Sequence, residues 1–329
     1  MNSSNKNPLQ QATELYRTQM QAVDQCIHDN LQSDVMMIPA MGQYIVSSGG
    51  KRLRPLLCLI IARLFGYQGD RHIPLAVVVE FIHTASLLHD DVVDSSDQRR
   101  GAPSANGVWG NQASVLVGDY LFSRAFQMMV RDGDMDILRL MSDVTNALAE
   151  GEVLQLARTF HLQMSEKECL EIIERKTAVL FSAAAEVGAR VSGQSQEQGG
   201  KMAEYGMCLG VAFQLMDDAL DYVAEVASVG KPVGHDLEEG KITLPLIHAM
   251  RADAELGKRV EEISERGCYE GDDRDWVRER VAKQQGADHA MQMAKDYADR
   301  AKKALPSDGD GETRQLLADL ADFSARRPF

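Results

Sequence analysis

Three aspartates at the end of an apolar stretch are the side chains of this sequence best suited to chemistry. Asp90, Asp91 and Asp94 follow the apolar run 75–88, which predicts a buried helix that ends near them. Asp90 and Asp94 are four residues apart, so a helix places both on one face, one turn apart. Because the C-terminal end of a helix repels carboxylates, this cluster needs cations. Mg²⁺ is suitable, since it binds one or two carboxylates together with water and phosphate oxygens.

Two arginines follow this first acid cluster closely. Arg99 and Arg100 carry planar guanidinium groups that match the geometry of a phosphate. Carboxylates for Mg²⁺ and arginines for phosphate lie within a few residues of each other. The segment therefore predicts a site for a magnesium-bound diphosphate.

A second acid cluster repeats the pattern. Asp217, Asp218 and Asp221 end another apolar stretch, and Lys231 and Lys241 follow. A single motif of this kind is weak evidence, because aspartate is common and most acidic runs are solvated helix ends. Two copies, each at the end of an apolar helix and each followed by cations, favour metal binding. Two such helix ends can face one another and hold several Mg²⁺ ions between them.

Basic residues also stand at a glycine-rich turn and inside the first apolar helix. Lys51 and Arg54 lie where two glycines lead into a helix start, a natural anion site because free N–H groups point outward there. A solvated turn is the plain alternative. His83 lies about two turns before Asp90, where it is either a hydrogen-bonded core residue or a donor to phosphate.

Three further polar residues each have two interpretations. Lys176 and Thr177 interrupt the helical stretch 169–181, either as a surface pair or as a cation and a hydroxyl that face the cavity of the first acid cluster. Gln214 precedes the second acid cluster, either as an ordinary helix residue or as a dipole in the pocket.

Long amphipathic stretches must position these residues, and they indicate an all-α fold. Good helix formers recur throughout, and the sequence has only 9 prolines. Strand periodicity, fixed repeats and linker-like composition are not evident. We therefore expect one domain over residues 1–329, with long helices around one core and a flexible tail over 1–10. The expected helices are 11–32, 35–47, 56–65, 75–94, 113–130, 135–156, 165–192, 197–222 and 242–250, with a loop over 99–111, an irregular segment over 224–240 and charged helices beyond.

Composition and charge argue against several classes of protein. With 44% hydrophobic residues the chain can bury a large core, and its formal charge of −14 argues against a nucleic-acid binder. The five cysteines are scattered without metal-ligand spacing, which favours reduced thiols. Since no apolar run reaches the ~18 residues of a membrane span and the N-terminus has no signal-peptide core, we expect a cytoplasmic protein.

Together these residues resemble the trans-polyprenyl diphosphate synthase family, and within it the octaprenyl diphosphate synthases of bacterial quinone biosynthesis. The match runs from about residue 49 to residue 250. Its landmarks are Gly-Gly-Lys-Arg-Leu-Arg-Pro at 49–55, the acid motifs at 90–94 and 217–221, Arg99-Arg100-Gly101, Gly151-Glu152-Val153, Lys176-Thr177 and Gly240-Lys241. The resemblance implies a helical bundle of the isoprenoid synthase type around a central cavity, several Mg²⁺ ions and a homodimer.

The resemblance also implies the reaction. Such enzymes elongate an allylic diphosphate, here expected to be farnesyl diphosphate, by repeated head-to-tail condensation with isopentenyl diphosphate. Metal ions and cationic side chains stabilise the diphosphate as its C–O bond breaks, and apolar walls shield the allylic cation from water. The departing diphosphate is the expected base. The expected product is a long all-trans chain, octaprenyl diphosphate, for quinone side chains, and a shorter or longer product of the same family is the alternative.

The family's pattern assigns a role to each candidate residue by position. The expected direct Mg²⁺ ligands are Asp90, Asp94 and Asp217, supported by Asp91, Asp218 and Asp221. The residues expected to hold the allylic diphosphate are Arg99, Lys176, Lys231 and Lys241. Those expected to hold isopentenyl diphosphate are Lys51, Arg54, His83 and Arg100. Thr177 and Gln214 are expected to face the reacting carbons, and with Lys176 they form the catalytic set.

Small residues before the first acid cluster are expected to set the product length. Ala85 and Ser86 lie about one turn deeper than the cluster and leave a tunnel open, where a bulky aromatic would cap short products in this family. The tunnel floor is expected on the next helix, at Phe126, Met128 or Met129, although plain core packing explains each of these equally well.

Three other functions compete with this interpretation. A terpene cyclase shares the chemistry but needs no isopentenyl site, so Lys51, Arg54 and the second acid motif argue against it. A phosphohydrolase of the HD type would use His89-Asp90 but leaves the second cluster unexplained. A non-catalytic synthase subunit tends to lose one acid motif, and this chain keeps both.

Overall fold

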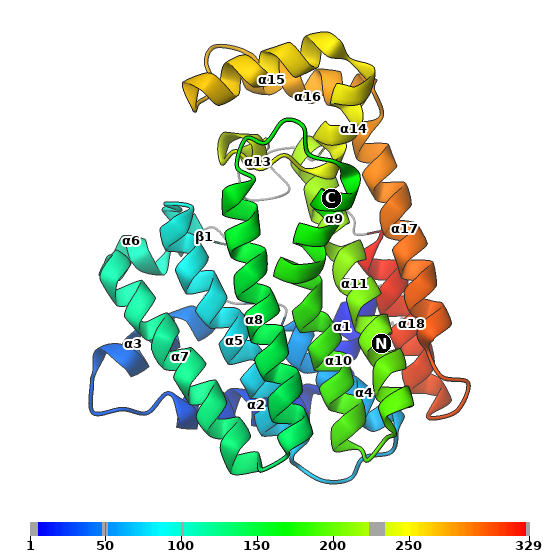
Figure 1. The fold of residues 1–329 in the computed structure, drawn as a ribbon. Coiled ribbons are helices and arrows are strands. Elements are labelled where there is room, and N and C mark those ends of the chain that lie inside the picture. The colour runs from blue at the N-terminus through cyan, green and yellow to red at the C-terminus, as the bar shows by residue number, and fades with distance from the viewer. Residues whose placement is uncertain (1–5, 48–49, 51, 100–101, 224–233, 327–329) are drawn as a thin grey trace. The chain divides into compact units, whose positions relative to one another are not determined.

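The computed structural model describes residues 6–47, 50, 52–99, 102–223 and 234–326, so Lys51, Arg100 and Lys231 lie outside the described residues. Within these ranges the regular structure is helical apart from one short hairpin, which confirms the all-α prediction (Figure 1). The hairpin pairs β1 (Gln98–Arg99) with β2 (Ala102–Pro103) in antiparallel register.

The helices follow one another with short connections. Before the hairpin they are α1 (Pro8–Leu15), α2 (Arg17–Asn30), α3 (Met37–Ser47), α4 (Leu53–Leu64) and α5 (His72–Val93). After it come α6 (Ala105–Trp109), α7 (Asn111–Asp132), α8 (Met135–Ala157), α9 (Glu166–Ile173), the π-helix η1 (Glu174–Ala178), α10 (Val179–Val191) and α11 (Gln196–Val223). The last are α13 (His235–Glu238), α14 (Leu244–Ala252), α15 (Ala254–Arg266), α16 (Asp273–Lys283), α17 (Gly286–Ala304) and α18 (Gly311–Ser324).

The chain divides into two compact units, and each is described by itself. The N-terminal unit comprises Met1–Thr145, Leu180–Gly206 and Ala304–Leu320. The C-terminal unit comprises Asn146–Val179, Met207–Lys303 and Ala321–Phe329. The single domain expected from the sequence stays a prediction.

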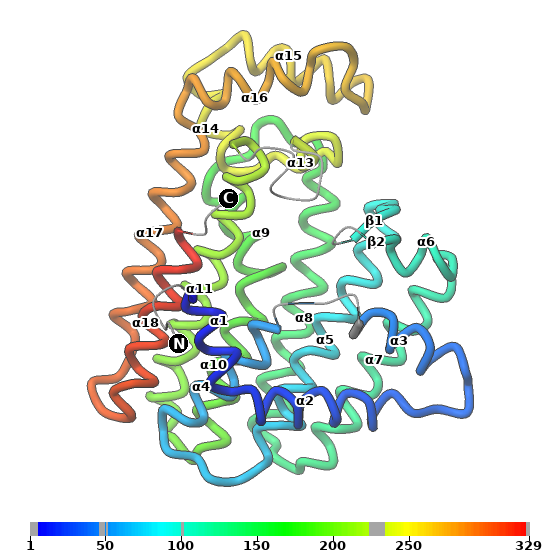
Figure 2. The backbone as a smooth tube through the Cα atoms, turned by 180° about the vertical axis from the view of Figure 1, so that it is seen from behind, coloured from blue at the N-terminus to red at the C-terminus, as the bar shows by residue number. Residues whose placement is uncertain are grey.

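The core of the N-terminal unit is built around α4. Its residues 56–61 are at most 1% exposed, as expected for a helix that is apolar on all sides. α4 packs against α5, and α5 packs along α7 (Figure 1). From behind, α2 lies against both α4 and α5 (Figure 2). These contacts hold the helix that carries the first acid cluster on three sides.

Burial in this core accounts for the apolar composition of α5. Among the described helices, α5 has the length and hydropathy of a membrane span, but 56% of the apolar window is buried inside the protein. A core helix passes the same test of length and composition. The absence of a membrane span stays a prediction.

In the C-terminal unit, α14 packs against α9, α15 and α16. Asp273 at the start of α16 is fully buried, and its carboxylate is paired with Arg259 and Arg266 of α15. The five cysteines of the chain are free thiols in the structure.

Several expected boundaries are wrong, each for a local reason. The helix expected over 11–32 is two helices, because Tyr16 leaves helical torsion angles (φ −100°, ψ 17°) and buries its ring. The tail expected over 1–10 is too long: α1 begins at Pro8, where Asn7 and Gln10 form a capping box. The loop expected over 99–111 contains β2 and α6, whose start is capped by the Ser104 hydroxyl. Residues 224–233 of the irregular segment lie outside the described residues.

Candidate active site

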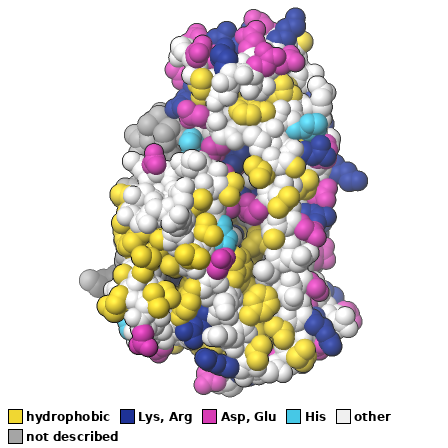
Figure 3. All heavy atoms as spheres, turned by 60° about the vertical axis from the view of Figure 1, so that its left-hand side comes forward, with side chains coloured by type: hydrophobic (Ala, Val, Ile, Leu, Met, Phe, Trp, Pro, Cys, Tyr) yellow, Lys and Arg dark blue, Asp and Glu magenta, His cyan; other side chains and the backbone are white. Residues whose placement is uncertain are grey.

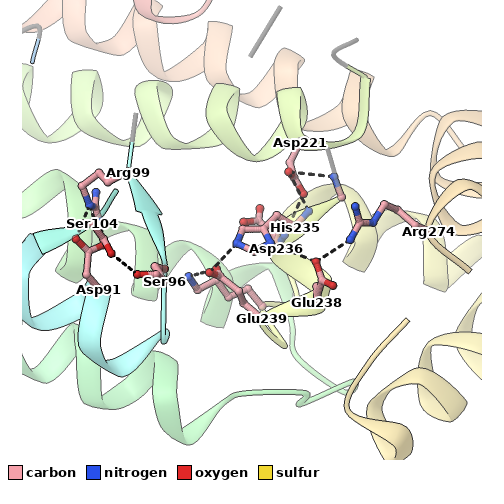
Figure 4. A network of polar contacts seen from close by, with 12 residues as sticks. Asp91, Ser96, Arg99, Ser104, Asp221, His235, Asp236, Glu238, Glu239 and Arg274 are labelled. Atoms are coloured by element: carbon pink, nitrogen blue, oxygen red, sulfur yellow. Dashed lines mark hydrogen bonds and ion pairs between the residues drawn. The ribbon is translucent and has the colours of Figure 1, made fainter. Parts of the chain in front are cut away.

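The first acid cluster lies at the C-terminal end of α5, in the N-terminal unit. Asp94 is the C-cap, and its N–H donates to the carbonyl oxygen of Asp90 at 2.8 Å. Asp91 is only 3% exposed, and its carboxylate is 2.6 Å from the Arg99 guanidinium (Figure 4). The Ser104 hydroxyl donates to the carbonyl oxygen of Ser96 at 2.6 Å and fixes the segment that carries Arg99 (Figure 4). Arg99 therefore neutralises the buried member of the cluster.

His89 anchors the same helix end to α7. Its Nε2 lies 3.1 Å from the carbonyl oxygen of Val115, and its ring packs near Phe122. A Cβ atom at Gly118 would lie 2.3 Å from that Nε2. Glycine at position 118 therefore leaves room for the His89 ring between α5 and α7.

Two residues expected to hold isopentenyl diphosphate contact each other in this unit. An Arg54 Nη1 on α4 lies 3.0 Å from Nε2 of His83 on α5, and the guanidinium lies 4.2 Å from the centre of the Phe181 ring. His83 also lines a cavity whose walls are otherwise largely apolar. That cavity is lined by Ile27, Leu31, Gly42, Ile45, Gly50, Arg52, Glu80, Phe81, His83, Thr84, Leu87 and Leu121.

The residues expected to control product length are buried in this unit or half-buried. Ala85 is fully buried, and the Ser86 hydroxyl donates to the carbonyl oxygen of His83 at 2.8 Å. On α7, Met128 and Met129 are buried and Phe126 is half-buried. None of these five lines the cavity described above. Their role in product length stays a prediction.

One cavity in the C-terminal unit brings together five of the predicted site residues. It measures about 130 Å³ and is lined by Lys176, Thr177, Gln214, Asp218 and Lys241. These residues come from η1, from α11 and from the segment before α14, which are distant in sequence. The remaining lining residues are Gln155, Arg158, Met164, Cys169, Ile172, Ile173, Asp236, Gly240, Ile242 and Thr243.

A chain of hydrogen bonds links the predicted catalytic residues to the second acid cluster. The Thr177 hydroxyl donates to Oε1 of Gln214 at 3.0 Å, and Nε2 of Gln214 donates to Asp218 at 2.8 Å. Gln214 and Asp218 are four apart on α11, which is the spacing of neighbours on a helix face. Both polar ends of the Gln214 amide are therefore used inside the cavity.

The backbone widens where Lys176 and Thr177 enter this cavity. η1 is a π-helical turn between α9 and α10, a feature that occurs often at functional sites. A Cβ atom at Gly151 of α8 would lie 2.8 Å from both the Cβ of Arg175 and the backbone nitrogen of Lys176. The wide turn therefore fits only because residue 151 has no side chain.

Two residues of α8 hold Lys176, and the sequence did not identify their role. The Lys176 Nζ lies 2.5 Å from Oε2 of Glu152 and 2.8 Å from Oε1 of Gln155. Glu152 and Gln155 are three apart on one helix face, and this spacing was the available signal. Lys241 is similarly paired with Glu239 at 2.5 Å.

Asp218 of the second acid cluster is buried, and burial disfavours its negative charge. Burial raises the pKa of Asp218 to about 7, although the hydrogen bond from Gln214 opposes this shift. Burial and then the nearby Asp221 and Asp218 raise the pKa of Asp236 well above its ordinary value. Burial also raises the pKa of Asp221, which accepts hydrogen bonds from the backbone N–H groups of residues 234–236 (Figure 4). Crowded carboxyl groups of this kind fit the oxygen-ligand chemistry of a divalent cation.

Asp236 was not among the expected site residues, and neither was its neighbour His235. The His235 imidazole lies between Glu238 and Glu239 (Figure 4). The hydrogen bond with Glu239 is the main cause that raises the pKa of His235. A protonated His235 therefore adds positive charge to a strongly acidic segment.

The two acid clusters belong to different units, so a shared cavity stays a prediction. Lys51, Arg100 and Lys231 lie outside the described residues, and their expected contacts with substrate stay predictions as well.

Comparison with known proteins gives a consistent result. The family model described as polyprenyl synthetase matches residues 35–280. The octaprenyl diphosphate synthase of Haemophilus influenzae is 46% identical over 311 residues, or 94% of each chain. The octaprenyl diphosphate synthase of Escherichia coli strain K12 is 43% identical over 324 residues, which cover 97% of this chain and 99% of that one.

Solved structures agree with this assignment. The crystal structure of a polyprenyl synthase from Caulobacter crescentus CB15, complexed with calcium and isoprenyl diphosphate, has a TM-score of 0.92 and 43% identity over the whole of both chains. A decaprenyl diphosphate synthase from Rhodobacter capsulatus has a TM-score of 0.90 and 41% identity, covering 97% of this chain and 98% of that one. The chain belongs to the polyprenyl synthetase family and is a prenyltransferase.

Proposed function

We propose that this enzyme elongates farnesyl diphosphate with isopentenyl diphosphate to octaprenyl diphosphate, for the side chains of quinones. The observation that carries the proposal is the cavity that joins Lys176, Thr177 and Gln214 to Asp218, in a chain of the polyprenyl synthetase family. Identities of 46% and 43% to octaprenyl diphosphate synthases over nearly the full chain favour this product length. The reaction needs both acid clusters in one site, and we therefore propose that residues 1–329 form a single catalytic domain.

Each group of side chains has a task in this reaction. Lys176 and Lys241 bind the allylic diphosphate, while Arg54 and His83 hold isopentenyl diphosphate. The amide of Gln214 and the hydroxyl of Thr177, fixed by their mutual hydrogen bond, direct their dipoles at the reacting carbons. The departing diphosphate accepts the proton that the new chain loses. Apolar residues of the cavity wall keep water from the allylic cation.

The metal of this site is Mg²⁺ in our proposal, and the crowded carboxyl groups of the second cluster support it. Its direct ligands are Asp90, Asp94 and Asp217, with Asp91, Asp218 and Asp221 in support. When bound, Mg²⁺ supplies positive charge that stabilises the leaving diphosphate.

An incorporation assay tests the activity. The chain is incubated with Mg²⁺, farnesyl diphosphate and radiolabelled isopentenyl diphosphate, and the products are dephosphorylated and separated by chain length. We expect label in a product of octaprenyl length. A terpene cyclase, a phosphohydrolase or a non-catalytic subunit would give no labelled polyprenyl chain, and label only in shorter or longer chains would contradict the product length.

Product length can be tested at two neighbouring positions on α5. Ala85→Tyr should shorten the product, because the new ring caps the tunnel expected on that face. Thr84→Tyr is the matched control, since Thr84 lines the cavity that the structure contains on another face of the helix. Chromatography of the products distinguishes the two. If only Thr84→Tyr shortens the product, the growing chain occupies the cavity that Thr84 lines. If Ala85→Tyr leaves the product length unchanged, Ala85 does not line the product tunnel.

We also propose a homodimer. Figure 3 shows hydrophobic side chains gathered on the face where α3, α6 and α7 lie. Of these helices, α6 contacts both α3 and α7. Exposed apolar residues on or next to these helices include Met36 and Met37, Val108, and Val115 and Leu116. An apolar face of this kind fits an interface between two copies.

Light scattering of two charge variants tests the dimer. Leu116→Glu should give a monomer mass, because it places a charge in the proposed interface. Leu15→Glu on α1, at similar exposure (60% against 67%), should stay dimeric. A wild-type protein with a monomer mass, or equal dissociation by both variants, would contradict the proposal.

We further propose a cytoplasmic location, and recovery in the membrane fraction after cell lysis would argue against it.

A further inference from the structure

We propose that Glu166, His248 and His289 form a second metal site, for Zn²⁺ or a similar transition-metal ion. One ligand atom of each residue lies within 4.8 Å of those of the other two. The three residues come from α9, α14 and α17 of the C-terminal unit. None of them belongs to the two acid clusters, so this site is independent of the proposed reaction.

The two imidazoles already lie together at this position. Their rings are stacked, with centres 4.1 Å apart and planes inclined by 19°. Nε2 of His289 is buried, has no hydrogen-bond partner among the residues that the structure describes and lies 3.5 Å from Oε1 of Glu166. Because buried polar atoms are nearly always satisfied, this nitrogen points to a missing ligand.

The third ligand is held on a rigid helix start. Glu166 is the first residue of α9, directly after Ser165, whose hydroxyl caps the helix and whose N–H and hydroxyl bind Glu168. As whole residues, all three proposed ligands are partly exposed.

The chemistry of these ligands selects the ion. Two imidazole nitrogens and one carboxylate form a set that binds Zn²⁺ in tetrahedral geometry with one open position. Mg²⁺ and Ca²⁺ prefer ligand sets made of oxygen, so they should not compete strongly here. The acid clusters offer only oxygens, and the two kinds of site can therefore be distinguished by spectroscopy.

One neighbour should oppose metal binding. Nη1 of Arg251, one turn after His248 on α14, donates to Oε1 of Glu166 at 2.7 Å. The Arg251 side chain is 55% exposed, so it can turn into solvent when a metal takes its place. Arg251→Gln should accordingly tighten metal binding by about 10-fold, the effect of removing one nearby like charge.

Cobalt titration of the full-length chain tests the site. Co²⁺ reports its own geometry, because tetrahedral Co²⁺ absorbs visible light strongly and octahedral Co²⁺ in an all-oxygen site absorbs weakly. We expect strong bands that saturate at one equivalent per chain and disappear when Zn²⁺ is added in excess. Addition of Mg²⁺ in excess should leave the bands in place.

Single variants locate the signal. His248→Ala and His289→Ala should each remove the strong bands, and Glu166→Gln should weaken cobalt binding by at least about 10-fold. His28→Ala, which removes an exposed histidine of the N-terminal unit, should change nothing. Because the wild-type spectrum alone decides the main point, a variant that fails to fold does not prevent the test. Only weak bands in the wild type, or strong bands that survive in both His248→Ala and His289→Ala, would overturn the proposal.

Discussion

The two acid clusters have the same sequence pattern and occupy similar positions at helix ends, yet their buried carboxylates are stabilised differently. At the first, Asp91 is paired with the Arg99 guanidinium. At the second, Asp218 accepts a hydrogen bond from the neutral amide of Gln214, and burial raises its pKa to about 7. The first cluster is thus partly neutralised by the chain itself, whereas the second needs a proton or a metal ion. The same acid motif therefore places carboxylates at both helix ends, but the residues that surround them differ.

The largest expected difference is in catalytic rate, between alanine variants of the glycine that packs beside each region, Gly151 and Gly118. Gly151→Ala would push against the backbone of η1, which cannot yield without moving Lys176 and Thr177. A displacement of about 1 Å can cost about 100-fold in rate, and we expect such a loss in kcat. Gly118→Ala would press only on the end of the His89 side chain, which can rotate, so we expect a loss below about 10-fold.

Steady-state incorporation of isopentenyl diphosphate measures both effects. Alanine is a better helix former than glycine by about 1 kcal/mol, so neither variant should unfold the protein for reasons of propensity. Thermal melting serves as the control for folding. Equal rate losses in the two variants would contradict the distinction between a backbone contact and a side-chain contact.

Smaller effects, opposite in sign at the two acid clusters, are expected on the thermal stability of asparagine variants. Asp91→Asn removes a buried partner of Arg99 and should destabilise the metal-free protein by about 1–3 kcal/mol. Asp218→Asn keeps an acceptor for Gln214 but removes a carboxyl whose charge is disfavoured by burial. At pH 8 it should therefore raise the melting temperature of the metal-free protein. Calorimetry of the metal-free variants measures both melting temperatures. A shift of the same sign in both variants would contradict the difference proposed between the two clusters.

The smallest expected effect is the pH dependence of the metal-free protein. Burial raises the pKa of Asp218 to about 7 in the folded chain, from an ordinary value of 3.8. A raised pKa stabilises the folded state below about pH 4, and that stability is lost as the pH rises through about 7. The raised pKa values of Asp221, Asp236 and His235 act in the same direction.

Melting curves at pH 5 and pH 8 test this sign. The melting temperature of the metal-free wild type should fall by a few degrees between them, and less so in Asp218→Asn. Mg²⁺ should reduce the fall, because it competes with protons for the same oxygens. If the metal-free wild type is more stable at pH 8 than at pH 5, the negative charges of the second cluster do not destabilise the folded state.

Much of the fold and of the candidate site follows from local patterns. Apolar periodicity predicted most helices, and the acid motifs fell at the ends of two of them. The interruption at Lys176 and Thr177 was visible in the sequence, because a cation and a hydroxyl break an apolar stretch. Their meeting with Gln214 in one cavity was expected from the family pattern, not from spacing alone.

Features that depend on long-range contacts could not be read from the sequence. A two-residue strand such as β1 has no period to detect. The π-helical turn depends on Gly151, which lies on another helix. Nothing local marks Arg99 as the partner of Asp91. The proposed site of Glu166, His248 and His289 joins three helices, and its residues have none of the short spacings that identify metal motifs.

We propose that both acid clusters bind the same metal–diphosphate group. A crystal structure of the chain with Mn²⁺ and a non-reactive thio analogue of farnesyl diphosphate tests it most directly, since anomalous scattering locates the metal. We predict Mn²⁺ ions that bridge the diphosphate to Asp90 and Asp94 on one side and to Asp217 on the other. Metal and diphosphate bound at only one cluster, with the carboxyl groups of the other cluster at an unrelated site, would contradict the account.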